Sequence, residues 1–221
     1  MSEVKTHVYF MPGMAANPSI FEYIKLPEEQ FETHFLHWQI PLKNEPLEDY
    51  AKRMTTFIEH DNPVLVGVSF GGVLVQEMAK IISVKKVIII SSVKCNKELP
   101  KRMVFAKYTH LHKLLPTGLV TNIELVAKYA FGESVTKRLD LYEKYLSVRD
   151  KYYLDWAIDA IINWKQKDPF PSVIHIHGDK DGVFPCINIH DCIKIKGGTH
   201  VMILNKFKWF NENLPKLILE N

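Results

Sequence analysis

A sharp turn with a central serine, placed between an apolar strand and a helix, is the feature that most constrains this chain. Residues 63–69 form a compact apolar run, and residues 71–82 space their apolar positions as a helix does. Between them stands a G-x-S-x-G sequence, Gly67-Val68-Ser69-Phe70-Gly71. The glycines are needed because a Cβ on either side would collide with the neighbouring strand and helix. Such a turn lifts the Ser69 hydroxyl to a sheet edge and aims the positive end of a helix at it.

Strands and helices alternate along most of the chain. Strand-like runs are predicted at residues 4–10, 31–38, 63–69, 86–92, 172–177 and 187–195. Helices are predicted at residues 19–24, 47–58, 71–82 and 200–219. Alternating elements with nearly continuous apolar strands imply an α/β fold, in which helices cover both faces of a mostly parallel sheet.

One long segment interrupts this alternation. Residues 95–170 have the pattern of helices throughout, and they fall between two predicted strands. Ligands of open α/β folds bind at the carboxyl edge of the sheet, which a helical insertion in this position would cover. We therefore divide the chain into a core of residues 1–94 and 171–221 and a helical lid or cap of residues 95–170.

Composition excludes several classes of protein. The 221 residues suit one domain with a full core, and 47% hydrophobic with 24% charged residues is an ordinary globular balance. A net charge of +3 without an arginine-rich motif gives no reason to expect nucleic-acid binding. We expect no signal peptide and no membrane span, because every apolar run is too short. Three cysteines without a paired pattern favour a reduced, cytoplasmic setting.

Two candidate catalytic residues follow the last two predicted strands. An acidic loop, His177-Gly178-Asp179-Lys180-Asp181, comes after the first of them, and Gly197-Gly198-Thr199-His200 comes after the second. A serine hydroxyl is a poor nucleophile at neutral pH and needs an adjacent base such as His200. Both aspartates are also good turn residues, so the loop alone does not say which of them orients the histidine.

The order Ser, Asp, His, with each residue at the carboxyl end of a different strand, resembles the α/β-hydrolase superfamily. The resemblance covers residues 1–93 and 172–221. The acid loop of that family often has the pattern G-x-x-D-x-x-x-P, which here falls on Gly178, Asp181 and Pro185 and favours Asp181 over Asp179. Because this chain starts where members usually have their third strand, the resemblance implies a trimmed sheet of about six strands.

The resemblance also implies roles for these residues. Ser69 would be the nucleophile, His200 the general base and Asp181 the acid that orients it. The backbone N–H of Phe70 would be one oxyanion donor, and that of Met14 is the candidate for the second. The implied activity is that of a serine hydrolase of the carboxylesterase or thioesterase type, acting on a small-molecule acyl ester or thioester. It implies neither a cofactor nor a metal.

Other interpretations stay open at this point. The same triad can serve C–C bond hydrolysis, acyl transfer or lyase chemistry, because fold and triad do not determine the substrate. A catalytically silent binding module with this fold is a further alternative. The alternation of His175, His177 and Asp179 is similar to the H-x-H-x-D-H segment of metallo-β-lactamase-like hydrolases, but that motif needs a histidine where this chain has Lys180. We therefore assign no metal ligand.

Overall fold

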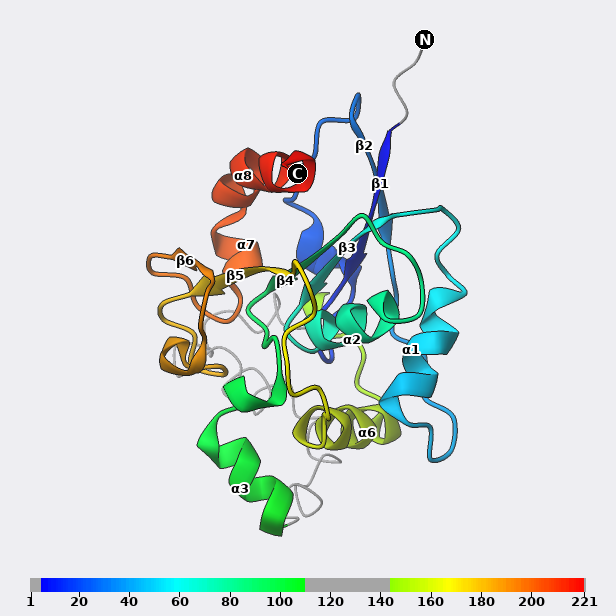
Figure 1. Ribbon diagram of the computed structural model, residues 1–221, viewed down its shortest axis with the longest axis vertical. Coiled ribbons are helices and arrows are strands. Elements are labelled where there is room, and N and C mark those ends of the chain that lie inside the picture. The colour runs from blue at the N-terminus through cyan, green and yellow to red at the C-terminus, as the bar shows by residue number, and fades with distance from the viewer. Residues whose placement is uncertain (1–4, 110–143, 221) are drawn as a thin grey trace.

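A computed structural model describes residues 5–109 and 144–220. Within them, six strands form one sheet in the order β2-β1-β3-β4-β5-β6, and every neighbouring pair is parallel (Figure 1). The strands are β1 (Thr6–Met11), β2 (Phe31–Phe35), β3 (Val64–Val68), β4 (Lys86–Ile90), β5 (Ile174–Gly178) and β6 (Ile193–Ile195). The predicted α/β sheet of about six strands is confirmed.

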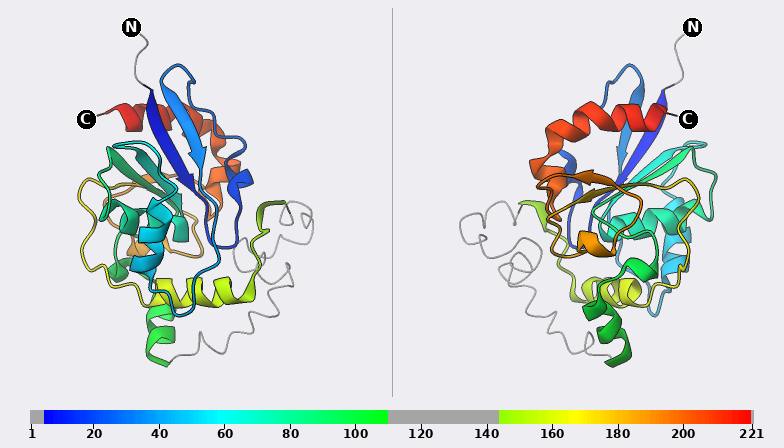
Figure 2. Two further views of the ribbon diagram at one scale, coloured as in Figure 1. Left: turned by 90° about the vertical axis from the view of Figure 1, so that its right-hand side faces the viewer. Right: turned by 60° about the vertical axis from the view of Figure 1, so that its left-hand side comes forward.

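Helices lie on both faces of the sheet, as its apolar strands require. The described helices are α1 (Leu47–Thr55), α2 (Phe70–Ala79), α3 (Lys101–Thr109), α6 (Lys151–Ile162), α7 (Met202–Asn205) and α8 (Phe207–Leu219). Helices α1 and α2 cover one face and α8 covers the other (Figure 2). This arrangement leaves the carboxyl ends of the strands as the edge at which loops gather.

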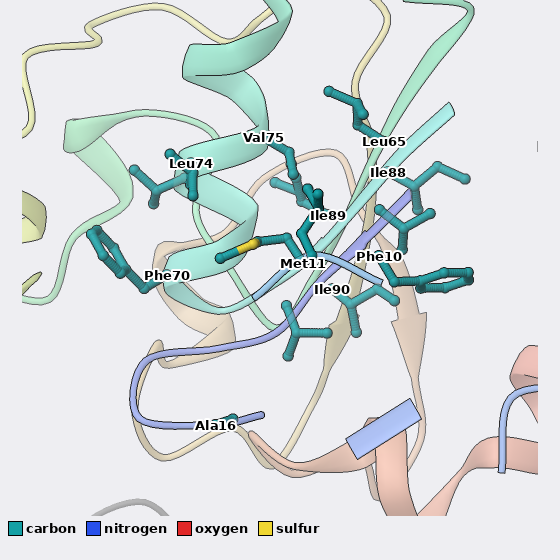
Figure 3. Packing of buried hydrophobic residues seen from close by; sticks show 14 of the residues in the cluster. Phe10, Met11, Ala16, Leu65, Phe70, Leu74, Val75, Ile88, Ile89 and Ile90 are labelled. Carbon is teal, nitrogen blue, oxygen red and sulfur yellow. The ribbon is translucent and has the colours of Figure 1, made fainter. Parts of the chain in front are cut away.

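The core is built on the two central strands. Every residue of β3 is buried, and the last four residues of β4 are buried as well. Figure 3 shows side chains of β4, among them Ile89 and Ile90, beside Val75 of α2 and Met11 of β1. Burial of an aliphatic side chain contributes about 1.5–3 kcal/mol to folding, so this layer holds α2, and the turn that precedes it, firmly on the sheet.

Some predicted elements differ from those observed. Residues 19–24 form a 3₁₀ turn, Pro18–Phe21, rather than a helix, because the chain closes i→i+3 bonds such as that from the Glu22 N–H to the Ser19 carbonyl. The predicted strand 187–195 is wrong in its first half, where Pro185 leads into a 3₁₀ turn, Cys186–Asn188. The predicted helix 200–219 begins at Met202 and is divided between α7 and α8.

Two helices of the predicted insertion are described. Helices α3 and α6 lie beyond the carboxyl ends of β1 and β2 (Figure 2). Trp156 of α6 anchors that helix to the core, since its indole N–H donates to the Glu45 carbonyl at 2.7 Å. Within the segment 95–170 that we expect to be helical, α3 is described as far as Thr109, and residues 110–143 lie outside the described residues. The domain boundaries stay a prediction.

Two global features bear on the chain's setting. Among the described helices, none combines the length and apolarity that crossing a bilayer requires. The three cysteines, Cys95, Cys186 and Cys192, all lie in described parts of the chain and are free thiols. The cytoplasmic location therefore stays a prediction from composition.

Candidate active site

Ser69 occupies a strained turn between β3 and α2. Its backbone has φ 52° and ψ −122°, a region that residues with a Cβ rarely adopt. The flanking glycines make this turn possible, because a Cβ at Gly67 would lie 2.4 Å from the Gly71 carbonyl oxygen, and one at Gly71 would lie 2.3 Å from the Pro12 oxygen. Strain of this kind costs about 1–3 kcal/mol and persists only where the surroundings enforce it.

Neighbouring strands enforce the turn. The Ser69 N–H donates to the Ile90 carbonyl at 2.9 Å, and the Ser92 hydroxyl donates to the Ser69 carbonyl at 2.7 Å. Both partners come from the end of β4 and the loop that follows it. Phe70 is the first residue of α2, so its N–H belongs to the helix terminus, where backbone donors face outward. The Ser69 side chain and the Phe70 N–H are therefore held next to each other.

A close backbone contact brings the acid loop and the histidine loop together. A Cβ at Gly178 would lie 2.2 Å from the carbonyl oxygen of Gly198, so the two loops touch only because neither residue has a side chain. The Lys180 N–H donates to the same Gly198 oxygen at 2.8 Å. Asp181 and His200 follow these contacts directly in their respective loops.

The three residues proposed from sequence form one hydrogen-bonded chain. His200 Nε2 lies 2.9 Å from Ser69 Oγ, and His200 Nδ1 lies 2.9 Å from Asp181 Oδ2. The Asp181 side chain is fully buried, whereas 11% of the His200 side chain is exposed. With its Nδ1 proton donated to the carboxylate, the ring presents the Nε2 lone pair to the serine hydroxyl. This is the geometry that abstraction of a serine proton needs.

Electrostatics keep the Asp181 carboxylate ionised. Burial by itself would raise the pKa of Asp181, but the hydrogen bond and charge of His200 outweigh it and lower the pKa below its ordinary value. Backbone N–H groups of Val183 and Phe184 also donate to Oδ1, at 2.8 and 2.9 Å. A carboxylate held in this way orients the imidazole and stabilises the cation that forms during proton transfer.

Asp179, the alternative acid, has a different environment. Its Oδ1 accepts the Gly197 N–H at 2.7 Å in an exposed turn. It thereby ties the end of β5 to the loop that carries His200. The structure places Asp181, and not Asp179, against the histidine ring.

The loop after β1 lies against the serine. A Cβ at Gly13 would be 3.3 Å from the Ser69 Cβ, a tight contact, so glycine favours this close approach of the loop. The carbonyl of Gly13 accepts a buried hydrogen bond from Trp38, and the Trp38 ring stacks on Phe70 with ring centroids 5.2 Å apart. The peptide N–H that follows Gly13 belongs to Met14, the residue proposed as second oxyanion donor.

Sequence patterns do not indicate three residues that lie near the triad. The pattern at Trp38 predicts only a strand, His177 resembles only a metal ligand, and nothing in the sequence singles out Phe184. The Phe184 ring meets that of His200 edge-on, with centroids 5.5 Å apart, and its carbonyl lies 2.9 Å from His177 Nε2. Only proximity in space, which leaves no local pattern in the sequence, connects these residues with Ser69.

The topology and the turn together define the class of fold. A parallel sheet with a strand–serine–helix turn, and with acid and histidine at the ends of later strands, is the α/β-hydrolase fold, and solved structures that match almost the whole chain have it. No protein-family model matches the sequence, and no curated protein matches it.

The similar solved structures have several different activities in their names. A bromoperoxidase from Bacillus anthracis has a TM-score of 0.68 at 18% identity, covering 98% of this chain and 93% of that one. An esterase from Exiguobacterium antarcticum has a TM-score of 0.65 at 18% identity, covering 97% and 92%. An enol-lactonase from Burkholderia xenovorans has a TM-score of 0.70 at 12% identity, covering 98% and 92%. At these identities the likeness establishes the fold alone.

Proposed function

We propose that the chain is a serine hydrolase that cleaves a carboxylic ester or thioester through an acyl-enzyme on Ser69. The observation that carries this proposal is the continuous hydrogen-bonded chain from Ser69 Oγ through His200 to Asp181, with 2.9 Å at each contact. A serine needs such a base within hydrogen-bonding distance to act as a nucleophile. The esterase among the similar structures is consistent with this activity.

The reaction proceeds in two halves. His200 Nε2 takes the hydroxyl proton as Ser69 Oγ bonds to the substrate carbonyl carbon, whose π electrons move to oxygen. The tetrahedral intermediate collapses, and His200 gives the proton to the departing alcohol or thiol, which leaves an acyl ester on Ser69. Water then attacks that ester with His200 as base, and the proton returns to Oγ as the carboxylic acid departs. Asp181 remains ionised throughout.

Two backbone donors would stabilise the oxyanion. The N–H of Phe70 lies at the start of α2, where the helix dipole also favours negative charge. The N–H of Met14 is the second proposed donor, in the loop that passes beside Ser69. A donor of this kind is worth about 3 kcal/mol in the transition state of acyl transfer.

The experiment is intact-mass detection of a fluorophosphonate adduct. Wild-type protein should gain one adduct, and the Ser69→Ala variant should gain none. Ser83→Ala, which removes an exposed serine after α2, is the matched control and should label like wild type. Labelled protein would then be followed up with p-nitrophenyl esters and acyl thioesters of graded chain length. Failure of folded wild-type protein to label would contradict the proposal and favour a binding module.

Labelling without ester or thioester turnover would point instead to other chemistry on the same serine. Candidates are then a C–C hydrolase, an acyltransferase or a lyase, since the triad serves all of these. Adding an acceptor alcohol or amine to the assay separates acyl transfer from hydrolysis, because transfer yields a new ester or amide rather than a free acid.

A further inference from the structure

Three histidines from distant parts of the sequence meet on one face of the sheet. His7 lies on β1, His34 on the edge strand β2, and His60 in the loop of residues 56–63 between α1 and β3. One ring nitrogen of each lies within 4.8 Å of the other two. All three side chains are partly exposed, so the cluster is reachable from solvent.

Strand register explains why the rings converge. In the parallel pairing of β1 with β2, His7 lies opposite Glu32 and Tyr9 lies opposite His34. Side chains two residues apart on a strand share a face, so all four project to the same side. The Tyr9 ring stacks on His34 with centroids 4.4 Å apart, and the His7 ring stacks on His60 with centroids 3.5 Å apart.

The geometry points to a site for a divalent transition metal, and we propose that His7, His34 and His60 bind Zn²⁺ or a similar borderline cation. Imidazole nitrogens are ligands that zinc, copper and nickel prefer. Tetrahedral ligands about 2.0–2.1 Å from zinc are about 3.4 Å apart, and His7 Nδ1 already lies 3.1 Å from His34 Nε2. The ion replaces the proton these two nitrogens share, and each ring then carries its proton on its other nitrogen.

The third ring must rotate out of its stack on His7 to bind the ion. His7 and His60 are nearly parallel, with 12° between their planes, so they must tilt for their lone pairs to meet at one ion. Tyr9 orients the His60 ring, because its hydroxyl lies 2.7 Å from His60 Nδ1 and leaves Nε2 for the metal. Ligating histidines generally have such a partner on the second nitrogen.

A fourth ligand is available at the open side of the cluster. The Glu32 carboxylate lies 3.6 Å from His7 Nδ1, and 53% of its side chain is exposed. Either this carboxylate or a water molecule completes a tetrahedral set, since zinc accepts both. Three histidines with one such ligand form a complete coordination shell.

The proposed metal site is separate from the serine site. Met11, which pairs with Gly67 near the serine turn, follows His7 by four residues of strand, or about 13 Å. The metal would therefore link the start of β1, the edge strand and the loop before β3. Its expected role is structural, because an ion bound only by the folded chain stabilises that state.

The test uses the full chain without an affinity tag, treated first with EDTA. Titration with zinc chloride followed by calorimetry should show one equivalent bound, and Co²⁺ should give the visible absorption of a tetrahedral complex. At a hundredfold excess over Kd, zinc should raise Tm by about 5–10 °C. His34→Gln and His60→Gln should each lose both effects, whereas His37→Gln, which removes an exposed histidine outside the cluster, should keep them.

Circular dichroism establishes whether each variant is folded. If His34→Gln does not fold, the His60→Gln variant, which changes a loop residue, tests whether the cluster binds zinc. Zinc binding that is absent from wild type, or undiminished in the variants, would overturn the site. Loss in only one of two folded variants would overturn the three-histidine assignment.

Discussion

The indole Nε1 of Trp38 donates a buried hydrogen bond of 2.8 Å to the carbonyl oxygen of Gly13. The N–H of Ala16 donates to the same oxygen at 3.1 Å, so two donors fix the plane of this peptide unit. A trans peptide holds its N–H opposite its carbonyl, and the N–H here belongs to Met14. We therefore propose that Trp38, together with the Ala16 N–H, sets the direction of the proposed second oxyanion donor, and that Trp38 is a positioning residue.

Trp38→Phe should therefore impair the chemical step. Phenylalanine keeps an aromatic ring against Phe70 but cannot donate to Gly13, so the Ala16 N–H alone still holds this oxygen and the peptide is held less firmly. Complete loss of an oxyanion donor costs about 10²–10³ in kcat, and a loosened one should cost about tenfold to a hundredfold. We expect kcat for a p-nitrophenyl ester to fall while KM changes little. Trp209→Phe, on α8, is the matched control; an equal fall there, or a change in KM alone, would refute the role.

Two substitutions of Ser69 should distinguish the loss of the hydroxyl from the release of backbone strain. Ser69→Ala and Ser69→Gly should both abolish turnover, by as much as about a millionfold where a triad acts as a unit. Glycine adopts φ 52° without penalty, whereas alanine does not, so the glycine variant should be more stable than the alanine variant by about 1 kcal/mol. Urea denaturation of both proteins measures this difference. A more stable alanine variant would argue against strain at this position.

The two aspartates of the acid loop should differ in their effect on rate. Asp181→Asn should lower kcat by about 10⁴, because an amide in contact with His200 Nδ1 favours the wrong tautomer. Asp179→Asn alters only the contact to the Gly197 N–H and should retain most of the activity. Steady-state kinetics of both variants decide between them. The reverse order would reassign the acid.

Buried neutral histidines should make the protein less stable in mild acid. Burial lowers the pKa of His175 and of His177. The unfolded chain therefore takes up protons near pH 6.5 that the folded chain does not. The free energy of unfolding is thus highest above pH 6.5 and falls below it, with a slope that approaches about 1.4 kcal/mol per pH unit for each histidine that stays neutral.

His175→Gln checks this expectation, since glutamine does not titrate. Between pH 6.5 and 5.5, in EDTA, the unfolding free energy should fall by about 1 kcal/mol less in the variant than in wild type, because a histidine of the unfolded chain is already half protonated near pH 6.5. His37→Gln, at an exposed position, should keep the wild-type slope. Equal slopes in wild type and His175→Gln would show that His175 is protonated in the folded protein as readily as in the unfolded chain.

Local sequence patterns were enough to predict those elements whose conformation is determined by residues close together in the chain. The turn at Gly67–Gly71 is predictable because the G-x-S-x-G sequence and its place between an apolar strand and a helix are local features, although the Pro12 oxygen that requires glycine at position 71 comes from a distant segment. The strand predicted at residues 187–195 failed for the opposite reason. Ile187 is apolar yet 86% exposed, and burial depends on what packs against a residue rather than on its own hydrophobicity.

The sequence by itself determined the α/β fold, the serine turn and the order of the three proposed catalytic residues, because strand–helix alternation and turn chemistry act over short distances. Only the tertiary structure placed Asp181 rather than Asp179 against His200, turned Trp38 toward Gly13, and gathered His7, His34 and His60. Those contacts depend on strand register and on close backbone approaches such as Gly178 to Gly198, which join segments far apart in the chain.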